Sequence, residues 1–155
     1  HALEWLKDNE NYMPDIVIQL RPTSPIRFKS DIQKAINLLI GHPDVDSIRA
    51  VSEPLTTPYK MWTMGDNKAL HPLLSLSGNH EPYNTARQDL PEIWAQTGTL
   101  EVIRYATIMN KKSMTGDKIF GLKIDQEAYI DIDTLNSFLL AELVLKKIDC
   151  IKPNK

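Results

Sequence analysis

The sequence predicts an α/β fold with a mostly parallel central sheet. Residues 15–20 and residues 46–53 are short apolar runs that are typical of strands. Between them, residues 30–41 place their apolar side chains on one helical face. A strand, a helix and a strand in this order make a right-handed crossover of a parallel sheet. A chain of 155 residues is also long enough to bury one core.

The first elements follow from local patterns. Residues 1–8 carry apolar side chains at helical spacing, as though a helix were entered midway, so we expect a fragment or a processed piece. The run 15–20 is almost continuously apolar, which predicts a strand buried on both faces of the sheet. Ser30 is a favourable N-cap for the next helix, and Gly41 ends that helix.

Residues 54–92 form an excursion from this alternation. Residues 65–67 predict a hairpin turn, but the stretch is too interrupted to build its own core easily. We therefore expect its exposed Trp62, Met64 and Tyr83 to pack on a second copy of the chain, which makes the protein a homodimer. The interruptions are the prolines Pro54, Pro58, Pro72, Pro82 and Pro91.

The alternation resumes after the excursion. Residues 100–104 and 118–124 predict strands, residues 106–112 predict a short helix, and the last helix has a mostly apolar face. We assign residues 1–155 to one partial domain that contains the 54–92 excursion. The apolar side chains on the face of the last helix are Leu135, Phe138, Leu139 and Leu143.

Composition excludes several classes of function. The formal net charge is -2, so no basic excess indicates nucleic-acid binding. No run approaches the roughly 20 apolar residues of a membrane span. The single cysteine, Cys150, excludes an intrachain disulfide and a thiolate metal cluster within this sequence. A reducing cytoplasm is the default location.

Residues 20–27 read Leu-Arg-Pro-Thr-Ser-Pro-Ile-Arg and directly follow the first apolar strand. Pro22 and Pro25 fix φ and disfavour helix before them, so this 20–27 loop is stiff and lies at the carboxyl end of a strand. Open α/β sheets bind ligands there, and guanidinium groups suit carboxylate or phosphate. The alternative is that the hydroxyls cap the turn and the arginines are solvated. The candidate binding side chains are Arg21, Thr23, Ser24 and Arg27.

Two carboxylates lie near the end of the chain, in residues 129–134. If this stretch is extended, Asp131 and Asp133 point to one side and make a reasonable Mg²⁺ or Mn²⁺ site together with phosphate oxygens and water. The alternative is that Asp133 or Thr134 is simply the N-cap of the last helix. The two interpretations are compatible.

Two cations in the excursion are further candidates. Lys60 is a point charge and Arg87 is a planar fork, a combination suited to clasping a carboxylate. Taken singly, each is more often a solvated surface cation. His42, His71 and His80 show no spacing typical of a metal site.

The 20–27 loop resembles the signature of the acylneuraminate cytidylyltransferases, the CMP-sialic acid synthetase family. Three further segments follow it in the family's order: the Pro-x-Lys motif with Lys60, the Arg-Gln-x-Leu-Pro motif that begins at Arg87, and the metal motif with Asp131 and Asp133. The resemblance implies a Rossmann-like sheet of the nucleotide-diphospho-sugar transferase type. It also implies that Arg21 and Asp133 are catalytic and that the acidic sugar contacts the side chains of Lys60, Arg87 and Gln88.

The chain also departs from the family pattern. Many members have Asn-Gly at the place of Thr97 and Gly98, so Gly98 fits the pattern and Thr97 does not. The threonine offers a hydroxyl in place of the asparagine amide, so a substrate contact made by that amide does not carry over to Thr97. The family's N-terminal glycine-rich nucleotide loop has no counterpart here, because the six glycines are scattered. We expect this chain alone to be inactive for that reason.

By resemblance, the complete enzyme joins CTP and a nonulosonic acid, such as the nine-carbon N-acetylneuraminic acid, to give a CMP-sugar and pyrophosphate. The rival enzymes activate 3-deoxy-manno-octulosonic, legionaminic or pseudaminic acid. The rival of another class is a non-catalytic dimerisation or binding module derived from the family.

Overall fold

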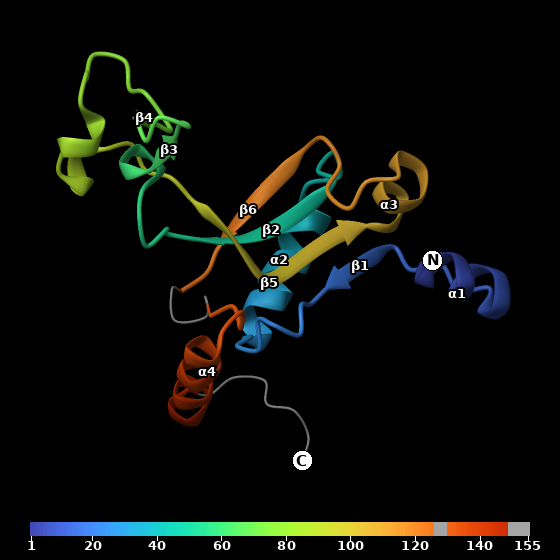
Figure 1. Ribbon diagram of the computed structural model, residues 1–155. Coiled ribbons are helices and arrows are strands. Elements are labelled where there is room, and N and C mark those ends of the chain that lie inside the picture. Colours follow the sequence, from blue (N-terminus) through green and yellow to red (C-terminus); the bar gives the residue numbers. More distant parts are fainter. Residues whose placement is uncertain (126–129, 149–155) are drawn as a thin grey trace. The chain divides into compact units, whose positions relative to one another are not determined.

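The structure is a computed structural model that describes residues 1–125 and 130–148 (Figure 1). The chain forms two compact units, of which the first comprises residues 1–52 and 96–155 and the second residues 53–95. Tyr129 and Cys150 lie outside the described residues. None of the helices in the described part of the chain is long and apolar enough to cross a bilayer.

The central sheet of the first unit confirms the α/β class. In spatial order the strands of this sheet are β1 (Ile16–Gln19), β5 (Ala95–Arg104), β2 (Ser47–Ser52) and β6 (Ile119–Lys123). β5 pairs antiparallel with β1, and β2 pairs parallel with β6. The Arg104 N–H at the end of β5 donates to the Asp46 carbonyl, and the Thr97 hydroxyl near the start of β5 donates to the Ala50 carbonyl, so β5 also runs antiparallel to β2. β1, β2 and β6 therefore share one direction.

The prediction that residues 15–20 are buried on both faces is wrong. β1 is an edge strand of the described sheet, and its Ile18 is 39% exposed. An apolar run does not distinguish a doubly buried strand from an edge strand that lines a cavity. Here Val17 and Ile18 line a cavity of about 470 Å³ with residues of α1 (Ala2–Glu10) and α3 (Tyr105–Lys111).

Helix α2 (Lys29–Gly41) packs its predicted apolar face on the sheet. Ser30 is not its N-cap; Phe28 takes that position without a side-chain hydrogen bond. Phe28 packs in a cluster around Ile26, so burial of the preceding loop decides where the helix begins and overrides the capping preference of serine. The main core cluster contains Ala35, Leu39, Val45, Ile48, Ala50, Leu100 and Val102.

The last helix, α4 (Leu135–Lys147), has a well-formed start. The Thr134 hydroxyl accepts the Ser137 N–H at 3.1 Å, and the Ser137 hydroxyl accepts the Thr134 N–H at 3.0 Å. This reciprocal arrangement is a capping box. Of the two N-cap candidates in the sequence, Thr134 is therefore the cap. Ala141 is the buried residue of the helix, while Leu135, Phe138, Leu139 and Leu143 are largely exposed.

The second unit consists of short pieces. The predicted hairpin turn is present, because Gly65 donates to Ala69 at 2.9 Å and the two flanking strands pair antiparallel. The Trp62 ring packs against Tyr83 in a tilted arrangement, with ring centroids 4.5 Å apart. Tyr83 is therefore half-buried and not exposed as predicted, whereas Trp62 and Met64 are exposed. Its elements are η1 (Pro58–Lys60), β3 (Trp62–Met64), β4 (Leu70–Pro72), η2 (Pro82–Asn84) and η3 (Arg87–Asp89).

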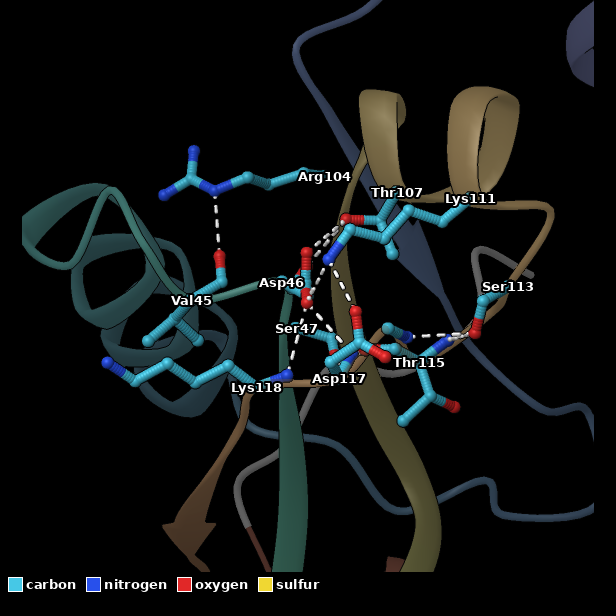
Figure 2. Close-up of polar contacts among 11 residues, drawn as sticks. Val45, Asp46, Ser47, Arg104, Thr107, Lys111, Ser113, Thr115, Asp117 and Lys118 are labelled. Atoms are coloured by element: carbon cyan, nitrogen blue, oxygen red, sulfur yellow. Dashed lines mark hydrogen bonds and ion pairs between the residues drawn. The ribbon is translucent and has the colours of Figure 1, made fainter.

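A carboxylate network ties the start of β2 to α3 and to the loop before β6 (Figure 2). The Asp46 carboxylate is mostly buried and accepts hydrogen bonds from Lys111 at 2.8 Å and from Thr107 at 3.1 Å. It also accepts the backbone N–H groups of Asp117 at 2.8 Å and Lys118 at 3.1 Å. These donors, above all the Lys111 ammonium, hold the pKa of Asp46 well below its ordinary value.

We expect Asp46→Asn to lower the free energy of unfolding by about 2–3 kcal/mol, because charge-assisted hydrogen bonds to a buried carboxylate are lost. The folded-state pKa of Asp46 is depressed, so this contribution is fully present above an ordinary aspartate pKa of about 3.9 and is lost progressively as the pH falls from there toward the folded-state pKa. Urea unfolding measured from pH 7 to pH 3 checks both effects.

The matched control is Asp117→Asn. The Asp117 carboxylate also pairs with Lys111 at 2.8 Å, but its side chain is 89% exposed. We expect this change to cost less than about 1 kcal/mol. Equal losses for the two variants would contradict the structural importance assigned to Asp46.

Candidate active site

The 20–27 loop leaves β1 and turns back on itself. The Ser24 N–H donates to the Arg21 carbonyl at 3.2 Å, and the Arg27 guanidinium donates to the same carbonyl. Arg27 is thus at least partly occupied in holding the loop. Ser24 is 2% exposed, whereas Thr23 is exposed to solvent.

Ile26 anchors this loop in the core. It is fully buried and clusters with Ile130 and with Ala141 of α4. Full burial of such a side chain contributes about 1.5–3 kcal/mol. The path of the loop is therefore set by core packing as well as by its two prolines.

The 131–133 segment lies against this loop, although the two are far apart in the sequence. The Ile132 N–H donates to the Thr23 carbonyl at 2.8 Å, and the Ser24 hydroxyl donates to the Asp131 carboxylate at 3.4 Å. The structure therefore brings together two sets of residues that the sequence predicted separately. Hydroxyls, guanidinium groups and carboxylates meet at one place in the first unit.

The prediction that an extended backbone points Asp131 and Asp133 to one side is wrong. Residues 131–133 are not a strand, and the Asp133 N–H donates to the Asp131 carbonyl at 3.2 Å in a tight turn. Strand alternation therefore does not orient these side chains. The Asp133 carboxylate is not engaged in the helix cap, because Thr134 serves there.

The donor set has the chemistry that a hard cation requires. Asp131 and Asp133 provide carboxylate oxygens, the ligand type that Mg²⁺ and Mn²⁺ prefer. Among the described residues, no group of three or more His, Cys, Asp or Glu side chains is placed to hold a metal. The pair fits Mg²⁺ only together with phosphate oxygens and water, as is common where the substrate is a nucleotide.

Gly98 of β5 lies directly beside the 20–27 loop. A Cβ atom at this position would lie 2.6 Å from the Ser24 Oγ and 3.1 Å from the Arg21 Cδ. Glycine is therefore required by space. Its neighbour Thr97 is fully buried and donates its hydroxyl to the Ala50 carbonyl at 3.2 Å, so Thr97 belongs to the interior of the sheet.

Sequence reasoning missed Glu101, which pairs with Arg21, and two further side chains that hydrogen-bond to Glu101. Glu101 pairs with Arg21 at 3.5 Å and with Arg49 at 3.4 Å, and Gln96 donates to Glu101 at 3.1 Å. In the sequence, each of these residues resembles an ordinary polar residue of a strand. The one signal in the sequence is the charged residue Glu101 between the apolar residues Leu100 and Val102.

Lys60, Arg87 and Gln88 belong to the second unit, which is described by itself. Arg87 and Gln88 line an open pocket of about 370 Å³, and Lys60 does not. The Arg87 guanidinium donates to the Pro54 carbonyl at 2.8 Å and lies 3.4 Å from the Glu53 carboxylate. The guanidinium of Arg87 in this pocket is thus exposed to solvent, and the Glu53 carboxylate partly neutralises its charge.

Comparisons with known proteins test the resemblance. No family model matches the chain. The N-acylneuraminate cytidylyltransferase of Streptococcus agalactiae serotype V is 25% identical over 136 residues, which cover 88% of this chain and 31% of that protein. The post-translational flagellin modification protein B of Campylobacter coli is 23% identical over 133 residues, which cover 86% of this chain and 54% of that protein. The chain thus spans only part of the length of these relatives.

Two solved structures share the fold. The 4-diphosphocytidyl-2C-methyl-D-erythritol synthase of Anaerococcus prevotii superimposes with a TM-score of 0.55 and 12% identity, covering 86% of this chain and 59% of that one. The CMP:2-keto-3-deoxy-manno-octonic acid synthetase, solved in complex with CTP, superimposes with a TM-score of 0.54 and 10% identity. The superposition covers 94% of this chain and 67% of that one. The predicted resemblance is confirmed: the chain is similar in sequence to N-acylneuraminate cytidylyltransferases and has the fold of nucleotide-diphospho-sugar transferases.

Proposed function

We propose that this chain is the acid- and metal-binding part of a cytidylyltransferase. The reaction joins CTP to an acidic nine-carbon sugar such as N-acetylneuraminic acid and gives a CMP-sugar and pyrophosphate. The observation that carries the proposal is the contact between the 20–27 loop and the 131–133 segment, through Thr23 with Ile132 and Ser24 with Asp131. The similarity to N-acylneuraminate cytidylyltransferases supports it.

The proposed reaction is a nucleotidyl transfer. A sugar hydroxyl attacks the α-phosphorus of CTP and releases its proton to solvent, and the bond from that phosphorus to the bridging oxygen breaks as pyrophosphate leaves. Arg21 offers guanidinium donors to an anionic group of the substrates, because Glu101 engages only one of its terminal nitrogens. A bound Mg²⁺ or Mn²⁺, held by Asp131 and Asp133, would neutralise phosphate charge.

Positioning supplies much of the rate in such a reaction. The buried Ile26 and Ser24 give the loop a fixed path, and the Ile132 N–H keeps the 131–133 segment beside it. The chain therefore contributes a rigid arrangement of charges whose geometry is set before substrate binds.

The identity of the acid is tested by a panel. The full-length protein is assayed for CTP-dependent pyrophosphate release with N-acetylneuraminic, legionaminic, pseudaminic and 3-deoxy-manno-octulosonic acids. We expect release with N-acetylneuraminic acid. Release with only one or more of the other three acids would favour the rival enzymes, and silence with every acid would favour a non-catalytic assembly module.

Arg87→Ala is expected to raise the KM of the full-length protein for the acid about 10- to 100-fold, with the KM for CTP nearly unchanged. Arg87 is the cation that lines the second-unit pocket, and losing a charge-assisted hydrogen bond to a carboxylate typically weakens binding by this factor. Lys7→Ala on α1 removes the same charge from an exposed surface and serves as the control. Equal losses for acid and CTP would refute the assignment.

We also propose a homodimer that works in the cytoplasm, where CTP is made. The second unit exposes the large apolar side chains of Trp62, Met64 and Leu70 on β3 and β4, and a second copy of the chain would cover them. Sedimentation equilibrium of the full-length protein checks this, and a single-chain mass at micromolar concentration would contradict it.

A further inference from the structure

Glu101 is a buried carboxylate whose partners are charged or polar side chains. Its side chain is 4% exposed. Oε1 accepts hydrogen bonds from Arg21 Nη2 at 3.5 Å and from Gln96 Nε2 at 3.1 Å, and Oε2 accepts from Arg49 Nη2 at 3.4 Å. An ionised carboxylate persists in such a place only when it is paired and hydrogen-bonded. Glu101 thus depends on two guanidinium groups and one amide.

Glu101 is held in place by partners other than Arg21. Arg49 Nη1 donates to Gln96 Oε1 at 2.7 Å, and Arg49 Nη2 donates to Thr115 Oγ1 at 2.8 Å. Arg49, Gln96 and Glu101 therefore form a closed set of hydrogen bonds. A planar guanidinium held at both terminal nitrogens has little freedom to turn. The carboxylate that Arg21 meets is consequently fixed.

The sheet register brings Arg21 to this carboxylate. Gln19 of β1 lies opposite Glu101 of β5, and Arg21 stands two residues beyond Gln19. Residues two apart in extended chain point to the same side, and diagonal cross-strand neighbours are within reach of long side chains. The Arg21 side chain is 44% exposed, so one end of it is bound while much of it faces solvent.

We propose that Glu101 is a positioning residue that orients the Arg21 guanidinium toward the anionic substrate. This inference rests on the proposed function and names a further residue of the same site. Glu101 fixes one terminal nitrogen of Arg21, and the absence of a Cβ at Gly98 leaves room for the Arg21 side chain to pass. The remaining donors of Arg21 then face the ligand in one orientation, which lowers the entropy lost on binding.

A double-mutant cycle in the full-length protein tests the proposal. Glu101→Gln keeps the size of the side chain and removes its charge, and we expect kcat/KM to fall roughly tenfold to a hundredfold. In the Arg21→Ala background the same change should have less than about a twofold effect, because the guanidinium that Glu101 is proposed to orient toward the substrate is then absent. A merely structural role would produce the same loss in both backgrounds.

Each outcome decides the question. Loss in both backgrounds, or no loss in either, overturns the positioning role while the proposed function stands. No pyrophosphate release by the unmodified protein with any acid of the panel overturns the proposed function itself. Should Glu101→Gln not fold, Gln96→Ala removes one hydrogen bond to Glu101 from an exposed side chain, and its loss must likewise vanish in the Arg21→Ala background.

Discussion

Asp133→Asn is expected to lower kcat of the full-length protein at least about a thousandfold at saturating Mg²⁺. The side chain keeps its shape but loses the charge that a hard cation requires. The rest of the segment should stay in place, because the Ile132 N–H still donates to Thr23 and Thr134 still caps α4. The measurement is steady-state turnover, together with Mn²⁺ binding in the presence of CTP by electron paramagnetic resonance.

The control for this prediction is Asp8→Asn. Asp8 is an exposed carboxylate on α1, so its change alters net charge equally and should leave turnover and Mn²⁺ binding unchanged. Normal turnover in Asp133→Asn would remove this residue from the metal site. Lost turnover with undiminished Mn²⁺ binding would assign Asp133 a role other than metal ligation.

The second large effect is expected from Gly98→Ala, which should lower kcat/KM about a hundredfold, the scale of a displacement of about 1 Å at a catalytic group. The new Cβ would lie 2.6 Å from the Ser24 Oγ, and Ser24 is too deeply buried to yield easily. It would also press on the Arg21 side chain at 3.1 Å. The 20–27 loop would have to move away from β5, and the 131–133 segment that is hydrogen-bonded to it would have to move with it.

Gly41→Ala is the matched control. Gly41 is the last residue of α2, and a Cβ there would meet nothing within 4 Å. We expect this variant to keep full activity and a thermal midpoint at or above that of the unmodified protein. If Gly98→Ala is equally harmless, the close approach of the loop to β5 is not required for the reaction.

The strongly patterned parts of the fold were predictable from the sequence. The crossover through α2 and the hairpin turn follow from local patterns of apolar residues, prolines and glycines. The 20–27 loop was predictable because Pro22 and Pro25 leave few backbone conformations. Its binding role came from the resemblance and not from local physics.

The remaining features depend on contacts between residues that are distant in the sequence. Arg104, the last residue of β5, donates to the carbonyls of Leu39 at 2.6 Å and His42 at 3.0 Å and so caps the carboxyl end of α2. The pairing of Arg21 with Glu101 is of the same kind, since it requires the register of β1 on β5. No local propensity encodes such pairs, and the same applies to the half-buried Phe28, which takes the N-cap position in place of Ser30.

The most direct test of the central claim is ³¹P NMR of the full-length protein incubated with CTP, Mg²⁺ and N-acetylneuraminic acid. We predict that a phosphodiester signal of the CMP-sugar and the signal of pyrophosphate grow in equal amounts, and that neither grows when the acid or Mg²⁺ is omitted. CTP that stays intact with every acid of the panel, or that yields phosphate without a CMP-sugar, would contradict the account.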